Sequence, residues 1–153
     1  MSREKIPSPL VLVVDDEALI RWSLSEALAE CGHTVRLAGS AAEARAVVTS
    51  LDGEPLVVLL DLRLPDMADL SLLRELRSRR PDAPVIMMTA HGTPEDGRQA
   101  TALGASAFDA KPFDVAEMVR MVDAVWHQHT GEASPSLPPH ILLKNASPCT
   151  RRR

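Results

Sequence analysis

The stretch Leu56–Leu60, with the sequence LVVLL followed by Asp61, decides the fold of this chain. Its apolar residues are consecutive rather than alternating, which is typical of a strand that is covered on both faces of a sheet. Two further runs, Leu10–Val14 and Val85–Met88, have the same character. Strands buried on both sides belong to parallel sheets, so these three runs predict the centre of one.

Segments with helical spacing separate these runs from each other and from two weaker strands, Thr34–Leu37 and Ala107–Ala110. The predicted helices cover Ala18–Cys31, Ala41–Ser50, Leu70–Arg80, Thr93–Leu103 and Val115–His129. Ser40 with Glu43 is placed to form a capping box, and Gly32 and Gly104 are placed to stop helices. Five strands that alternate with five helices predict an α/β, doubly wound fold with a parallel sheet.

Length and composition limit the organisation and the function. The 153 residues allow one domain, which we expect at 10–129, after an N-terminal extension (1–9) and before a flexible Ser/Pro-rich tail (130–153). A net charge of −4 argues against direct nucleic-acid binding, and no apolar run reaches the length of about 20 residues needed to span a membrane. Two cysteines, Cys31 and Cys149, favour a reducing compartment, so we expect a cytoplasmic protein.

Acidic residues gather where two of the predicted strands end. The first strand is followed by Asp15, Asp16 and Glu17, and the third by Asp61. Neighbouring parallel strands bring their ends together, and carboxylates about 4 Å apart repel by roughly 4 kcal/mol at an effective dielectric of 20. Such a cluster favours a hard divalent cation, and Mg²⁺ is the natural choice.

The ends of the other two strands carry complementary groups. Thr89 ends the fourth strand, and Lys111 with Pro112 follows the fifth. A hydroxyl and an ammonium group can bind the oxygens of a phosphoryl group attached to a carboxylate. Asp61 lies between these groups and the other acids, so we expect it to be the nucleophile.

Four segments carry a resemblance to a known family: VVDDE at 13–17, LDLRLPD at 60–66, MTA at 88–90 and KPF at 111–113. Together they resemble the signature segments of response-regulator receiver domains of two-component systems. The resemblance covers about Leu10 to Trp126, and it implies a flavodoxin-like sheet with the strand order 2-1-3-4-5.

The resemblance implies that Asp61 accepts a phosphoryl group from a sensor histidine kinase. It further implies that Asp16 and Asp61 hold Mg²⁺, together with the backbone carbonyl of Arg63 and with Asp15 acting indirectly. Lys111 would pair with the phosphoryl oxygens. Such a domain regulates other proteins, so we expect no enzyme beyond its own phosphotransfer and slow dephosphorylation.

The resemblance also implies a switch. Thr89 would move toward the phosphoryl group, and Phe108 matches the aromatic residue whose rotamer follows it. Arg63 and His91 match positions that tune the lifetime of the phosphate. The helix at about Pro94 to Leu103 and the adjoining loops are then the expected output face.

Residues 20–24 and 89–96 are most similar to receivers of the enhancer-binding, nitrogen-regulation type. An ATPase and a DNA-binding domain normally follow such receivers, but this chain has neither a GxxxxGK[ST] loop nor a helix-turn-helix after Trp126. We therefore expect a stand-alone receiver or the front part of a longer regulator, with an unknown output partner and homodimerisation left open.

Three alternatives or departures remain. A small Mg²⁺-dependent phosphatase using Asp61 is disfavoured because Asp61-Leu62-Arg63 has no second acid. A phosphorylation-independent pseudo-receiver stays open because Ala68-Asp69 replaces the usual Asp-Gly. If the missing glycine normally serves a left-handed turn, Asp69 can still adopt that conformation at some cost. Trp22 and Trp126 are both expected to be packing residues.

Overall fold

The structure is a computed structural model that describes residues 8–67, 69–90 and 93–130. Its sheet contains five parallel strands in the order β2-β1-β3-β4-β5, as the family resemblance implied. The strands are β1 (Leu10–Val14), β2 (Thr34–Ala38), β3 (Leu56–Asp61), β4 (Val85–Thr89) and β5 (Ala107–Ala110). The helices are α1 (Ala18–Glu30), α2 (Ala41–Ser50), α3 (Ser71–Arg79), α4 (Pro94–Ala102) and α5 (Val115–Thr130). All ten predicted elements are present, with ends within about two residues of those expected.

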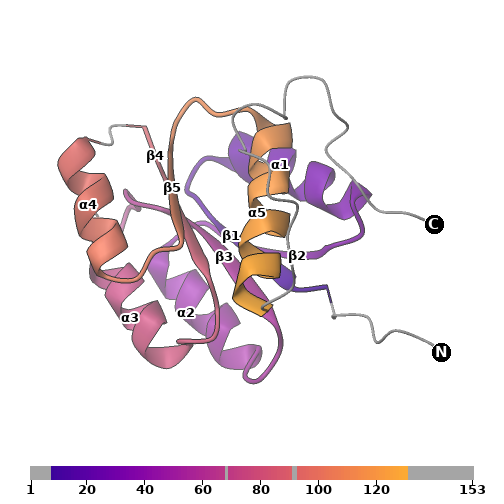
Figure 1. The fold of residues 1–153 in the computed structure, drawn as a ribbon, viewed down its shortest axis with the longest axis horizontal. Coiled ribbons are helices and arrows are strands. Elements are labelled where there is room, and N and C mark those ends of the chain that lie inside the picture. The colour runs from indigo at the N-terminus through magenta and orange to yellow at the C-terminus, as the bar shows by residue number, and fades with distance from the viewer. Residues whose placement is uncertain (1–7, 68, 91–92, 131–153) are drawn as a thin grey trace.

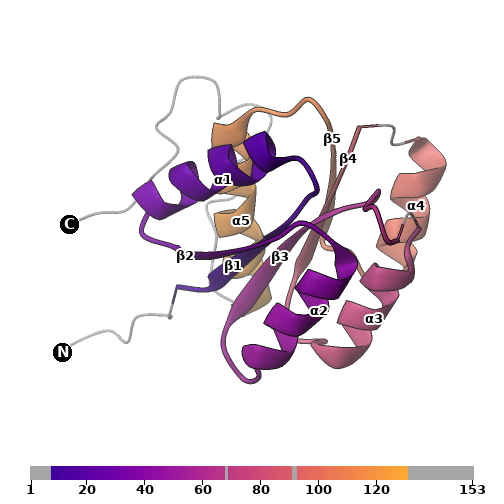
Figure 2. The ribbon, with the colours of Figure 1, turned by 180° about the vertical axis from the view of Figure 1, so that it is seen from behind.

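The central strands bury both of their faces, which explains their consecutive apolar residues. Successive side chains of a strand point to opposite faces. In β3, for example, Val58 and Leu60 belong to one core cluster, while Val57 and Leu59 belong to the other. Figures 1 and 2 show the two layers of helices: α2, α3 and α4 cover one face, and α1 and α5 cover the other.

Local signals end the helices where the sequence places glycine. After α1, Gly32 has a φ of 90°, its N–H donates to the carbonyl of Ala29, and the N–H of His33 donates to the carbonyl of Leu28. This is a Schellman motif, which satisfies carbonyls that the helix leaves without partners. Gly104 closes α4 with the same pair of hydrogen bonds and a φ of 102°.

The start of α2 departs from the predicted capping box. The Ser40 hydroxyl accepts a hydrogen bond from the Glu43 N–H as expected, at 3.2 Å. The Glu43 carboxylate, however, accepts from the N–H of Gly39 at 2.7 Å and not from that of Ser40. A full capping box instead occurs at α4, between Thr93 and Asp96.

Arg80 is a buried arginine that joins two loops at the edge of the sheet where the strands begin. Its guanidinium donates to the backbone carbonyls of Leu51 and Glu54, and it also makes a two-pronged ion pair with Asp82. The residue is only 6% exposed. A buried cation of this kind needs several acceptors, and here two loops supply them.

The two tryptophans differ in their surroundings. Trp126 of α5 is buried in the core, as expected. Trp22 of α1 is 60% exposed beside the exposed Leu19, so the prediction that it packs in the core is wrong. Among the described residues, no helix has both the length and the apolar content that a bilayer span requires.

Candidate functional site

Three carboxylates meet at the edge of the sheet where the strands end. Asp15 and Asp16 follow β1, and Asp61 is the last residue of the neighbouring β3, whose register pairs Val14 with Leu60. One oxygen from each carboxylate lies within 4.8 Å of the others. Asp15 and Asp61 are buried, while Asp16 is exposed. Oxygen ligands at this spacing suit a hard cation, so the cluster fits a metal site of the kind that the sequence suggested.

Lys111, which follows β5, reaches into the same cluster. Its Nζ lies 2.7 Å from Asp15 Oδ2, 3.2 Å from Glu17 Oε1 and 3.3 Å from Asp61 Oδ2. The sequence placed Glu17 among the acids but gave it no role. The ammonium group therefore partly neutralises a set of carboxylates that would otherwise repel each other.

Burial and the neighbouring charges shift the pKa of both Asp61 and Lys111. Burial raises the pKa of Asp61 above its ordinary value, the charge of Asp15 adds to this rise, and Lys111 with the Arg63 N–H opposes it. Burial lowers the pKa of Lys111, but the carboxylates of Asp15, Asp61 and Glu17 outweigh burial and raise it overall. Lys111 lies closest to Asp15, at 2.7 Å, and Asp15 makes the largest upward contribution to the pKa of Lys111.

Thr89 and Phe108 lie on the face of the sheet that α4 covers. Thr89 ends β4 and is fully buried, and its carbonyl accepts a hydrogen bond from the Lys111 N–H at 2.7 Å. Phe108 of β5 pairs in register with Met87, two residues before Thr89, so both side chains belong to the same face. The ring packs close to Gly97 of α4, where a Cβ would lie 3.7 Å from its Cδ1.

The loop after β3 holds Arg63 close to Asp61. The Arg63 N–H donates to Asp61 Oδ1 at 3.2 Å, while the Arg63 side chain is exposed. Asp69 does not have the left-handed conformation that it could adopt in place of glycine, since no described residue other than glycine has a positive φ. Its carboxylate instead accepts from the Ser71 N–H at the start of α3. His91 and Ala68 lie outside the described residues.

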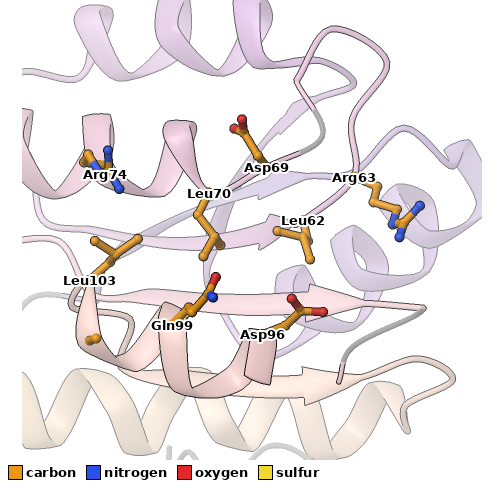
Figure 3. Close-up of a pocket in the computed structure, with 9 residues that line it drawn as sticks. Leu62, Arg63, Asp69, Leu70, Arg74, Asp96, Gln99 and Leu103 are labelled. Atoms are coloured by element: carbon orange, nitrogen blue, oxygen red, sulfur yellow. The ribbon is translucent and has the colours of Figure 1, made fainter. Parts of the chain in front are cut away.

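A pocket of about 440 Å³ opens beside this loop, between α3 and α4. Figure 3 shows Leu62, Leu70 and Gln99 between the two helices, with Asp96 on α4 near the end of the strands. Among the predicted site residues that the structure describes, Arg63 alone lines this pocket, and none of the three clustered carboxylates does.

Two residues around the site, Asp66 and Arg21, make hydrogen bonds that the sequence does not reveal. Asp66 accepts hydrogen bonds from the N–H groups of Ala41 and Ala42, at 2.8 and 3.0 Å. Arg21 of α1 donates to the backbone carbonyl of Asp15 at 2.6 Å. Partners that are distant in the chain, as Asp66 and α2 are, leave no periodic pattern that could reveal them.

Comparison with known proteins supports the family resemblance seen in the sequence over most of the chain. Residues 11–123 match the family described as the response regulator receiver domain. The DNA-binding transcriptional regulator NtrC of Escherichia coli K12 is 37% identical over 126 residues, which are 82% of this chain and 26% of that protein. The chain therefore spans about a quarter of the length of this relative.

Solved structures agree in fold. A CheY-like response regulator receiver domain from Methanospirillum hungatei JF-1 superposes with a TM-score of 0.74 at 26% identity, covering 83% of this chain and all of that one. The beryllofluoride-activated NtrC4 receiver domain, solved as a dimer, gives a TM-score of 0.72 at 32% identity, covering 78% of this chain and 97% of that one.

Proposed function

The chain belongs to the response regulator receiver domain family, and from this premise we propose that Asp61 is its phosphoacceptor. Such a domain is regulatory, and accepting a phosphoryl group is the general function of the family. The observation that carries the assignment is the convergence of Asp61, two further aspartates and Lys111 at one edge of the sheet.

The proposed donor is a sensor histidine kinase. A carboxylate oxygen of Asp61 attacks the phosphorus of a phosphohistidine, an O–P bond forms, the N–P bond breaks and the imidazole leaves. Lys111 already lies 3.3 Å from Asp61 Oδ2, so its ammonium is placed to bind a phosphoryl oxygen. Unlike turnover by a phosphatase, this reaction ends with the phosphoryl group on the protein.

Asp16, Asp61 and the backbone carbonyl of Arg63 are the proposed Mg²⁺ ligands, with Asp15 acting indirectly. Bound Mg²⁺ supplies positive charge that offsets the charge of the carboxylates and of the phosphoryl group. Asp15 is completely buried and already paired with Lys111, which suits it better to orienting than to direct ligation.

The proposed switch uses Thr89, Phe108 and α4. Thr89 donates a hydrogen bond to the new phosphoryl oxygen, Phe108 changes rotamer, and the position of α4 shifts with it. The closeness of the Phe108 ring to α4, where a Cβ at position 97 would lie 3.7 Å from it, supports this coupling. Arg63 and His91 are proposed to tune the lifetime of the phosphate. Amide spectra of α4 that do not change when beryllofluoride binds would contradict the switch.

The output partner is proposed to be an effector domain joined to this receiver or a separate protein. The NtrC relatives are DNA-binding regulators about four times as long as the matched region, and the NtrC4 receiver forms a dimer when activated. A homodimer of this domain is therefore a reasonable active state, and a cytoplasmic location would bring it to the kinase.

Intact mass after treatment with acetyl phosphate and Mg²⁺ tests the proposal. Wild type is expected to gain about 80 Da, the mass of one phosphoryl group, and Asp61→Asn or addition of EDTA is expected to abolish the gain. Asp69→Asn, an exposed carboxylate in the adjoining loop, is the matched control and should gain the same mass as wild type. A wild type that gains no mass from any donor, including kinase candidates, would favour the phosphorylation-independent module.

A further inference from the structure

Asp66 connects the loop after β3 to the start of α2. Its carboxylate oxygens accept one hydrogen bond each from Ala41 and Ala42, the first two residues of the helix, at 2.8 and 3.0 Å. These two bonds are called the Asp66 tether below. The hydrogen bonds lower the pKa of Asp66, so the carboxylate is ionised and well suited to the positive end of the helix.

The tether completes the capping of α2 from outside the helix. The first N–H groups of a helix have no partner within it. The Ser40 hydroxyl accepts from Glu43, and the Ser40 carbonyl accepts from Ala44. The N–H groups of Ala41 and Ala42 have no partner in these bonds, and a residue 24 to 25 positions away accepts from both.

The loop that carries Asp66 is a tight turn directly after the proposed phosphoacceptor. Leu64 and Met67 form two backbone hydrogen bonds with each other, so that Pro65 and Asp66 lie at the tip of the turn. Leu64 is buried in the core at the base of the turn. The Leu64–Met67 hydrogen bonds therefore hold the base of the turn, and the Asp66 tether holds its tip. Arg63 lies next to the base.

A second group of contacts holds the same loop against α2. Arg45 of α2 donates from its Nε to both carboxylate oxygens of Glu75 of α3, at 3.0 and 2.8 Å, and its Nη2 lies 3.9 Å from the Met67 sulphur. The two helices on either side of the loop are thereby joined, so α2 offers a stable support for the tether.

We propose that Asp66 is a positioning residue for the metal site. The tether fixes the turn and so holds the backbone of Arg63 where its carbonyl can join Asp16 and Asp61 at Mg²⁺. The inference rests on the proposed function through the Mg²⁺ site alone. Removing a group that orients a metal ligand commonly lowers metal affinity 10- to 100-fold.

Calorimetric titration of Mg²⁺ into the full chain tests this role without any phosphorylation. Asp66→Ala is expected to raise the Mg²⁺ dissociation constant about tenfold. Asp66→Asn, which keeps an acceptor oxygen without the charge, is expected to recover part of the loss.

Two controls separate positioning from general effects. Ser40→Ala removes a cap from the same helix but leaves the tether, and Asp69→Ala removes a carboxylate and a helix cap from the same loop. Both are expected to bind Mg²⁺ within about twofold of wild type, since neither touches the turn at 64–67. Equal weakening in either control, or normal binding by Asp66→Ala, would overturn the proposal.

The mass measurement on wild type keeps the two proposals distinct. A wild type that gains no phosphoryl mass but loses Mg²⁺ affinity on Asp66→Ala substitution would refute the phosphoacceptor assignment and support the tether. A wild type that gains the mass while Asp66→Ala binds Mg²⁺ normally would do the reverse. A wild type that binds no Mg²⁺ would overturn the metal site and the role of Asp66 together.

Discussion

Asp61 is buried in the unphosphorylated protein. It is 5% exposed, lies near the buried Asp15 and has one close cation, Lys111. Burial and the charge of Asp15 raise its pKa, which means that its ionised form is less favourable in the folded protein than in the unfolded chain. A functional carboxylate of this kind lowers stability in the absence of metal.

Asp61→Asn is therefore expected to raise the free energy of unfolding by about 1 kcal/mol at pH 7 in EDTA. The folded-state pKa lies above the unfolded value, so the cost of ionised Asp61 is present above the folded pKa. It disappears as the pH falls below the ordinary value of 3.8. Urea unfolding of both proteins at pH 7 and at lower pH measures the difference. A variant that is less stable than wild type at pH 7 would show that the pairing with Lys111 outweighs burial.

Two glycines of the α4 region have opposite roles in that element. Gly97 lies inside the helix, with ordinary space for a Cβ beside the Phe108 ring. Gly104 lies just after the helix with a φ of 102°, and a Cβ there would approach the Arg77 side chain to 2.8 Å. The first costs helix stability, whereas the second is required by the backbone.

Gly97→Ala is expected to stabilise the protein by about 0.5–1 kcal/mol, because alanine favours the helix. Gly104→Ala is expected to destabilise it by about 1–2 kcal/mol, because the backbone is left-handed there and Arg77 must move. Thermal and urea unfolding of the two variants, compared with wild type, measure both signs. A destabilising Gly97→Ala would show that crowding against the Phe108 ring outweighs helix propensity, and a stabilising Gly104→Ala would contradict the need for glycine there.

At the scale of elements, the sequence predicts what is local and periodic. The apolar run at 56–60, the side-chain cap at Ser40 and the stops at Gly32 and Gly104 all depend on neighbours within a few residues, and the structure confirms them. The second half of the predicted capping box is absent, because the Glu43 carboxylate bonds Gly39. Asp66 could not be paired with α2 in advance, because hydrogen bonds between distant segments depend on the folded arrangement. Trp22 was assigned wrongly because that prediction rested on how tryptophans usually pack, whereas the four-residue spacing of the buried Leu24 and Leu28 leaves position 22 off the buried face of α1.

The whole molecule separates its chemistry from one of its main polar supports. The carboxylates, Thr89 and Lys111 lie where the strands end, whereas Arg80 lies where they begin. Arg80 binds carbonyls of the loop between α2 and β3 and the carboxylate of Asp82, which follows α3. A change at one edge should therefore leave the other largely intact.

Arg80→Met is expected to lower the free energy of unfolding by about 2 kcal/mol, because it leaves two carbonyls without their buried donor. Arg79→Met is the matched control, since that exposed neighbour donates only to Thr49, and its effect should be within about 0.5 kcal/mol of zero. The rate of adduct formation by Arg80→Met, measured well below its melting temperature, should equal that of wild type. A slower rate would show that the two edges are coupled.

The path of the chain places both of its described ends at the edge of the sheet away from the carboxylates. β1 starts at Leu10 on that edge, and α5 returns to it, bringing His129 close enough to Asp82 for their charges to interact. A fluorescent protein or an affinity handle fused before Leu10 or after Thr130 would leave through that edge. The domain is thus suited to serve as the sensing part of a biosensor, in which the linkers to the fused proteins can be lengthened or exchanged without obstructing the approach to Asp61.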